Sequence, residues 1–172
     1  YVDSLITEVN DLERKVDKAD IYALYIGGGT PTSLSDELFS KLIETVMRHF
    51  GNVDEITLEA GRPDTISDDK LTTAKYNGVN RICVNPQSMV DETLRLIGRK
   101  HDSVLIEQVY EKVRKVGFKH INMDIIAGLP NEGVDQFAYT LDKIKEMNPE
   151  SLTCHVLSIK HGSKMNECGA PD

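Results

Sequence analysis

The chain has 172 residues, of which 40% are hydrophobic and 28% charged, which is sufficient for one domain with a hydrophobic core. A formal net charge of −8 argues against a broad basic surface for nucleic acid. No apolar run is long enough to span a membrane and no secretory signal opens the chain. Three scattered cysteines (Cys83, Cys154 and Cys168) are too few for a disulfide framework, so we expect a reducing, cytoplasmic location.

The apolar residues alternate between helical and strand spacing along the whole chain, without hairpin signals. In chain order the pattern predicts a helix (2–16), strand (22–26), helix (38–50), strand (56–60), short helix (between Ser67 and Gly78), strand (79–84), helix (104–116), strand (121–126), helix (137–144) and strand (152–157). Ser35 and Ser67 are expected N-caps, and Gly51 and Gly117 are expected helix ends. We therefore expect one α/β domain over residues 1–172, with about five parallel strands and helical crossovers.

The turn after the first strand carries Gly27-Gly28-Gly29-Thr30-Pro31-Thr32. Glycines at the end of a strand let a ligand approach the backbone, because no Cβ stands in the way. The loop matches neither GxGxxG nor GxxxxGK[ST], the two common nucleotide-binding fingerprints. It therefore indicates a backbone site for a charged group of another kind.

Polar residues recur at the carboxyl ends of the later strands, namely Glu59, Asn85, Gln87, Asp124 and His155. The carboxyl ends of parallel strands meet at one rim, where ligands bind in open sheets and in barrels alike. Taken singly, Glu59 also fits a solvated strand end, and His155 is more typical of a hydrogen-bonded core histidine than of a ligand.

Asp124 is the strongest single candidate, because it lies between Met123 and Ile125 in an otherwise apolar strand. Burying an unpaired carboxylate costs several kcal/mol. We expect Asp124 to have partners or to point into a solvated ligand site, where vicinal sugar hydroxyls are a common partner.

These motifs together resemble the radical S-adenosylmethionine (SAM) enzymes, and most closely the oxygen-independent coproporphyrinogen III oxidases. The resemblance covers residues 21–159 and rests on residues 27–32, 58–60, 87–89, 96–99 and 122–130. It implies a partial (β/α)6 TIM-like barrel with SAM bound across its top. The residues it assigns to SAM are Gly27, Gly28, Gly29, Thr30, Glu59, Gln87, Arg99, Asp124 and Ile126. Of these, the glycine loop and Glu59 would hold the methionyl end, Arg99 the carboxylate, Gln87 and Asp124 the ribose, and Ile126 the adenine side.

The chain departs from the family in two respects. The CxxxCxxC loop that holds a 4Fe–4S cluster is absent, and the three cysteines present do not replace it, since cluster thiolates must converge. In addition, Glu59 is followed by Ala-Gly-Arg-Pro instead of Val-Asp-Pro. We therefore expect a fragment of a longer enzyme, inactive by itself, whose cluster ligands lie elsewhere and which contributes no metal ligand or catalytic residue of its own.

The implied reaction of the longer enzyme is oxidative decarboxylation of coproporphyrinogen III propionates to vinyl groups in haem biosynthesis, with SAM, the cluster and an electron donor. One alternative is a haem-binding carrier of the same family, for which His155 and His161 are weak ligand candidates. Another is a phosphate-binding α/β-barrel enzyme that uses the glycine loop. Because no strand precedes residues 22–26, we also expect self-association at that edge, or its coverage by residues 1–18.

Overall fold

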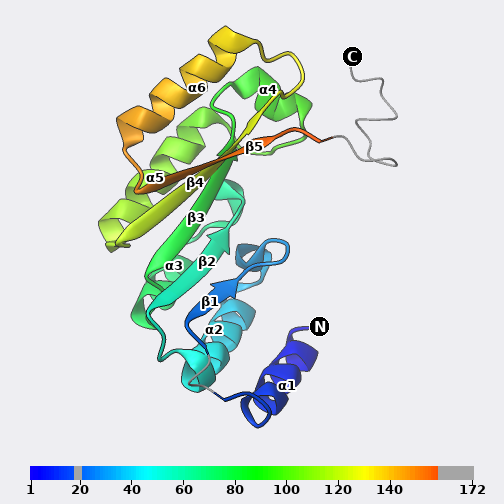
Figure 1. Cartoon of the computed structure of the whole chain (residues 1–172), viewed down its shortest axis with the longest axis vertical. Coiled ribbons are helices and arrows are strands. Elements are labelled where there is room, and N and C mark those ends of the chain that lie inside the picture. The colour runs from blue at the N-terminus through cyan, green and yellow to red at the C-terminus, as the bar shows by residue number, and fades with distance from the viewer. Residues whose placement is uncertain (18–20, 159–172) are drawn as a thin grey trace.

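The computed structural model describes residues 1–17 and 21–158 of the chain (Figure 1). Five strands alternate with helices: α1 (Val2–Glu13), β1 (Ala23–Ile26), η2 (Pro31–Ser33), α2 (Asp36–Phe50), β2 (Glu55–Ala60), η3 (Pro63–Thr65), α3 (Asp68–Tyr76), β3 (Arg81–Gln87), α4 (Asp91–Leu96), α5 (Ser103–Val116), β4 (His120–Ala127), α6 (Val134–Met147) and β5 (Ser151–Val156). None of the helices in these two ranges has the length and apolarity needed to cross a membrane. The candidates His161 and Cys168 lie outside the described residues.

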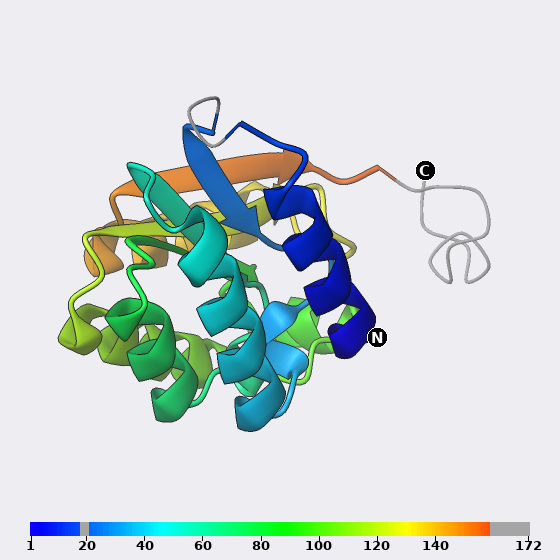
Figure 2. The ribbon, with the colours of Figure 1, turned by 90° about the horizontal axis from the view of Figure 1, so that it is seen from below.

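All five strands are parallel and lie in the sheet in chain order, β1-β2-β3-β4-β5. The helices between them lie on one side of the sheet (Figure 2), because right-handed crossovers between sequential parallel strands return the chain on the same side. The carboxyl ends of the strands consequently share one edge of the sheet. The expectation of an α/β fold with about five parallel strands and helical crossovers is confirmed.

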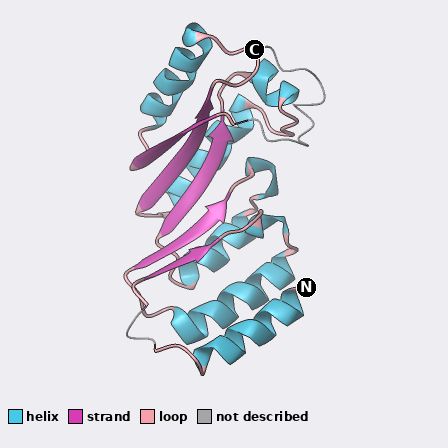
Figure 3. Ribbon diagram, turned by 45° about the vertical axis from the view of Figure 1, so that its right-hand side comes forward, coloured by secondary structure: helices cyan, strands magenta, loops and turns pink. Residues whose placement is uncertain are grey.

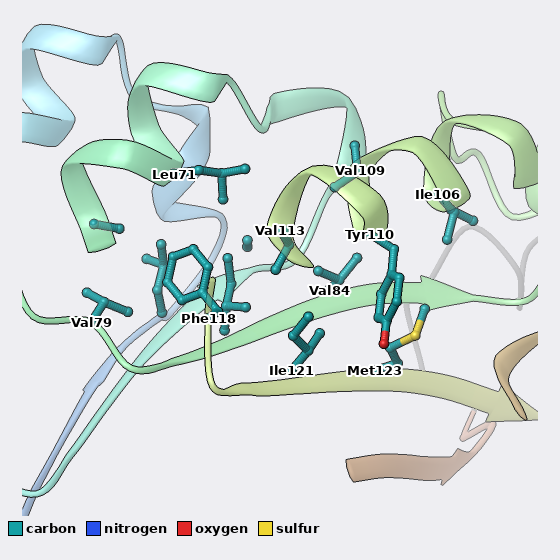
Figure 4. Close-up of a cluster of buried hydrophobic side chains, with 14 of the residues drawn as sticks. Leu71, Val79, Val84, Ile106, Val109, Tyr110, Val113, Phe118, Ile121 and Met123 are labelled. Carbon is teal, nitrogen blue, oxygen red and sulfur yellow. The ribbon is translucent and has the colours of Figure 1, made fainter. Parts of the chain in front are cut away.

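Figure 3 shows the strands and helices by type. One hydrophobic core fills the space between the sheet and its helices, and part of it is drawn in Figure 4. The strands contribute alternate residues to it, among them Leu58, Ile82, Ile121 and Met123, all fully buried. Alternation is expected, since successive side chains of a strand point to opposite faces. Burial of each such side chain contributes about 1.5–3 kcal/mol. This core holds the strands in register and so fixes the residues on the other face.

The helix ends follow the sequence signals. Ser35 Oγ accepts from Leu38 N at 3.4 Å, and Ser67 Oγ accepts from Lys70 N at 3.2 Å. Gly117 ends α5 with a left-handed φ of 88°, a conformation that glycine adopts without strain. These three predictions of helix boundaries are confirmed.

Two segments differ from expectation. β3 begins at Arg81 and continues to Gln87, so that Asn85 and Gln87 belong to the end of the strand and do not follow it. A register shift between Val84 and Gln87 lets the strand continue, and Gln87 adopts a φ of 71° there. The helix α4 was not predicted, because six residues are too few to show a helical period.

Among the described residues, β1 pairs only with β2 and therefore forms one edge of the sheet. α1 packs on α2 and lies beside β1 without pairing with it. A groove of about 540 Å³ lies between α1, α2 and β1. It is lined mainly by apolar side chains, such as Leu5, Val9, Leu24 and Leu42. Self-association at this edge stays a prediction.

Candidate functional site

The face of the sheet turned away from the helices is polar. Because side chains alternate along each strand, the residues between the core positions share this face. They include Tyr25 on β1, Glu59 on β2, Cys83 and Asn85 on β3, Asn122 and Asp124 on β4, and Thr153 and His155 on β5. Many of these residues are at the carboxyl ends of the strands, as the sequence predicted.

The glycine loop contributes exposed backbone to this edge. Gly28 and Gly29 have φ angles of 84° and 122°, and a Cβ built on either would meet nothing within 4 Å. These two positions therefore need glycine for their backbone conformation, and the space above them is open. At Gly27 a Cβ would lie 2.4 Å from Tyr25 Cε1 and 2.5 Å from Glu59 Oε2. Tyr25 and Glu59 thus lie directly against the start of the loop.

The carboxylates of Glu59 and Asp124 act on the titratable side chains of this face. Desolvation, followed by the charges of Cys83 and Glu59, raises the pKa of Tyr25 to about 12. Burial, followed by the charge of Asp124, raises the pKa of Cys83 to about 11. Desolvation disfavours a charge of either sign, whereas the carboxylates of Glu59 and Asp124 favour a positive charge near them. The face is therefore suited to a cationic ligand group.

Asp124 is held by the neighbouring amide. Asn122 Nδ2 donates to Asp124 Oδ1 at 2.6 Å. Asn122 Oδ1 in turn accepts from Ser151 Oγ at 2.6 Å and Thr153 Oγ1 at 3.2 Å, which orients the amide. The other carboxylate oxygen, Asp124 Oδ2, lies 4.0 Å from His155 Nε2. The expectation that Asp124 has partners is confirmed, and Oδ2 is left for a further donor.

His155 is not a core histidine. Its side chain is 59% exposed, because β5 forms the other edge of the sheet. The expectation of a hydrogen-bonded core position is therefore wrong. Ile126, one of the predicted adenine-side residues, is half-buried and lies beside His155 in the pairing of β4 with β5.

The end of β3 carries an unsatisfied polar group. Asn85 Oδ1 is buried and has no hydrogen-bond partner among the described residues. Gln87, at the bulge, is buried as well. An unpaired buried acceptor is costly unless a ligand or water satisfies it. Asn85 was noticed in the sequence as polar but was not assigned to the site, since nothing in the sequence shows which polar residues lack partners.

Arg99 lies in the turn between α4 and α5, at the carboxyl-end edge of the sheet. It is half-buried, and its backbone N donates to Leu94 O at 2.9 Å, whereas its guanidinium makes no hydrogen bond or ion pair with the described residues. Desolvation, followed by the charge of Arg62, lowers its pKa. The structure therefore gathers the residues predicted to bind SAM, from three strands (β2, β3 and β4) and two loops, at the carboxyl-end edge.

Comparisons with known proteins agree on one family. A family model described as the radical SAM superfamily matches residues 3–144. The chain is 45% identical over 148 residues to the oxygen-independent coproporphyrinogen-III oxidase-like protein HemZ of Bacillus subtilis, covering 84% of this chain and 30% of that protein. It is 31% identical over 163 residues to the heme chaperone HemW of the same organism, covering 93% and 43%.

The solved structures give the same result. Coproporphyrinogen III oxidase (HemN) from Escherichia coli, described as a radical SAM enzyme, superposes with a TM-score of 0.82 at 30% identity. The match covers 92% of this chain and 37% of that one. The expected partial TIM-like barrel architecture is thereby confirmed. The chain spans between about a third and somewhat under half of the length of these relatives.

Proposed function

The chain belongs to the radical SAM superfamily, and from that membership we propose that it forms the SAM-binding part of an oxygen-independent coproporphyrinogen III oxidase-like enzyme. The observation that carries the proposal is the convergence of the glycine loop, Glu59, Gln87 and Asp124 at the carboxyl-end edge of one parallel sheet. Ligands of parallel α/β folds bind at this edge.

The charges and donors of the site match the parts of SAM. The negative surroundings of Glu59 and Asp124 suit a ligand that carries an ammonium and a sulfonium. In this proposal the backbone of Gly27, Gly28, Gly29 and Thr30 and the side chain of Glu59 hold the methionyl end. Arg99 holds the carboxylate, since its guanidinium has no hydrogen-bond partner among the described residues and suits a carboxylate.

The other half of the ligand would lie along β3 and β4. Asp124 Oδ2 accepts from a ribose hydroxyl, while Oδ1 stays bonded to Asn122. Gln87 contributes to the same ribose, and Ile126 offers an apolar surface to the adenine.

The residues described do not fit an iron–sulfur cluster. Cys83 is buried on β3 and Cys154 is exposed on β5, and no three metal-binding side chains converge in residues 1–17 and 21–158. A 4Fe–4S cluster needs several converging thiolates. We propose that the thiolates of the family cluster come from a part of a longer protein outside these 172 residues, and that the chain alone is inactive.

The chain supplies binding and orientation for the proposed reaction. SAM, when bound, would supply the means of abstracting a hydrogen atom from the substrate. We propose that this atom comes from a propionate side chain of coproporphyrinogen III. An electron donor would be a further partner. The residues of this chain would fix the ligand at its carboxylate, ammonium and ribose and keep water from it. The polar sheet face would be turned toward the substrate.

A haem carrier is the second candidate, because the heme chaperone HemW is 31% identical over 93% of the chain. The two candidates differ in the outcome of an anaerobic assay on the longer protein with SAM and a reductant. Conversion of coproporphyrinogen III to a product with vinyl groups favours the oxidase. Stoichiometric haem binding without conversion favours the carrier.

Ligand binding by the chain tests the proposed site directly. We expect S-adenosylhomocysteine to bind in titration calorimetry, and sugar phosphates not to bind. Asp124→Asn should weaken this binding about tenfold, the equivalent of one charge-assisted hydrogen bond. Asp142→Asn, an exposed change on α6, is the matched control and should have no effect. Tighter binding of sugar phosphates than of S-adenosylhomocysteine would overturn the proposal in favour of a phosphate enzyme.

A further inference from the structure

The loop after β2 carries Arg62, which belongs to the Ala-Gly-Arg-Pro run found after Glu59 in place of Val-Asp-Pro. The chain passes close to the site just before it, since a Cβ on Gly61 would lie 3.4 Å from Asn85 Nδ2 and 3.6 Å from Glu59 Oε1. Arg62 follows and is exposed, and Pro63 begins the short helix η3. The backbone at Arg62 therefore lies at the same edge of the sheet as Glu59.

A second loop meets this one. His101 lies in the segment between α4 and α5, and its Nδ1 is 3.7 Å from Asp64 Oδ1, with its side chain fully buried. Its Nε2 faces the carbonyl oxygen of Pro86 at 3.5 Å. Because His101 is two residues after Arg99 and Asp64 is two residues after Arg62, this contact brings the two arginine-bearing turns together at the ends of β2 and β3.

Because these two turns meet, the guanidinium groups lie within electrostatic reach of each other: desolvation, followed by the charge of Arg62, lowers the pKa of Arg99. The negative charge of Asp64, which faces His101, acts in the opposite direction and raises the pKa of Arg99. No hydrogen bond or ion pair joins either guanidinium to the described part of the chain. By contrast, Arg81 and Arg114 are each paired with a glutamate.

The repulsion between these neighbouring cations acts on Arg99 more strongly than the attraction of Asp64 does, and an anionic ligand between the two guanidinium groups would offset it. Guanidinium groups bind carboxylates through two parallel hydrogen bonds, which makes a carboxylate the best-matched anion. We infer that Arg62 and Arg99 together hold one carboxylate, the α-carboxylate of SAM. This inference rests on the proposed function, and it adds Arg62 as a binding residue that the family resemblance does not assign.

Binding of paired ligands by the chain tests the role of Arg62. The probes are S-adenosylhomocysteine and decarboxylated SAM, which keeps the adenosyl and ammonium groups but has no carboxylate. Arg62→Gln should weaken binding of S-adenosylhomocysteine about tenfold, the loss of one charge-assisted interaction. It should leave binding of decarboxylated SAM unchanged. Arg48→Gln, an exposed change on α2, is the control and should alter neither affinity.

Arg62→Lys adds a check on the geometry, since lysine keeps the charge but lacks the planar pair of donors. It should recover only part of the lost affinity, and its far-UV circular dichroism should match that of the wild type. Equal weakening of both probes by Arg62→Gln would show that Arg62 acts on the fold, and would overturn the inference. Unchanged binding of S-adenosylhomocysteine would overturn it as well, while leaving the proposed function intact.

The propionates of a tetrapyrrole carry the same carboxylate chemistry, so coproporphyrin III is a third probe. If Arg62→Gln weakens its binding and spares S-adenosylhomocysteine, the arginine pair serves the substrate, and the assignment to SAM is overturned. A wild-type chain that binds neither adenosyl probe would overturn the proposed function, and the inference with it.

Discussion

Replacing Asn122 with alanine should destabilise the fold much more than its single side chain suggests. The change removes three hydrogen bonds: the one donated to Asp124 Oδ1 and those accepted from Ser151 Oγ and Thr153 Oγ1. A bond to a carboxylate is worth about 1.5–3 kcal/mol and a neutral one about 0.5–1.5 kcal/mol. Since the two hydroxyls on the edge strand can turn to water, we expect a total loss of about 2–4 kcal/mol.

Equilibrium unfolding in urea, followed by far-UV circular dichroism, measures this loss. The midpoint should fall while the slope m stays unchanged, because the surface exposed on unfolding is nearly the same. Thr153→Val is the control: it keeps the volume and removes one neutral bond of 3.2 Å, so it should cost about 0.5–1.5 kcal/mol. If Asn122→Ala costs no more than Thr153→Val, the bond to Asp124 contributes nothing and our account of this network is wrong.

Three further results follow from the geometry. Gly29→Ala should lower the free energy of unfolding by about 1–2 kcal/mol, because its φ is 122°; an unchanged urea midpoint would contradict this. Ile121→Ala should cost about 2–5 kcal/mol in the same assay, since Ile121 is fully buried, whereas Leu96→Ala on the exposed side of α4 should cost less than about 1 kcal/mol. Cys83 has a pKa raised to about 11, so only about one in a thousand of its thiols is ionised at pH 8, and the fraction rises with pH. Iodoacetamide at pH 8 should therefore modify exposed Cys154 and spare Cys83 until urea is added, as peptide mass spectrometry would show; equal rates would refute the raised pKa.

The strand and helix order was predictable because its signals are local. Ser35, Ser67 and Gly117 act within one turn of their own helix, and the apolar runs mark the strands directly. Asp124 was also recognisable, because a charged residue in an apolar run needs an explanation. These features depend on neighbours in the sequence alone.

The rest of the site depends on residues far apart in the chain. The orientation of Asn122 comes from hydroxyl groups on β5, 29 and 31 residues away, which only the strand register brings together. The exposure of His155 follows from its place on an edge strand, and no local pattern distinguishes edge strands from central ones. Arg62 is inconspicuous in sequence, since an arginine in a loop is usually solvated.

The sequential order of the strands has a mechanical consequence. Within the sheet each strand is hydrogen-bonded only to its neighbours, so β1 and β4 share no direct bond. One ligand could contact all four successive strands or the loops at their ends, through Gly28, Glu59, Gln87 and Asp124. Such a ligand would link β1 to β4. Ligand binding should therefore protect the backbone amides of β1 and β4 from hydrogen exchange together, although two strands separate them.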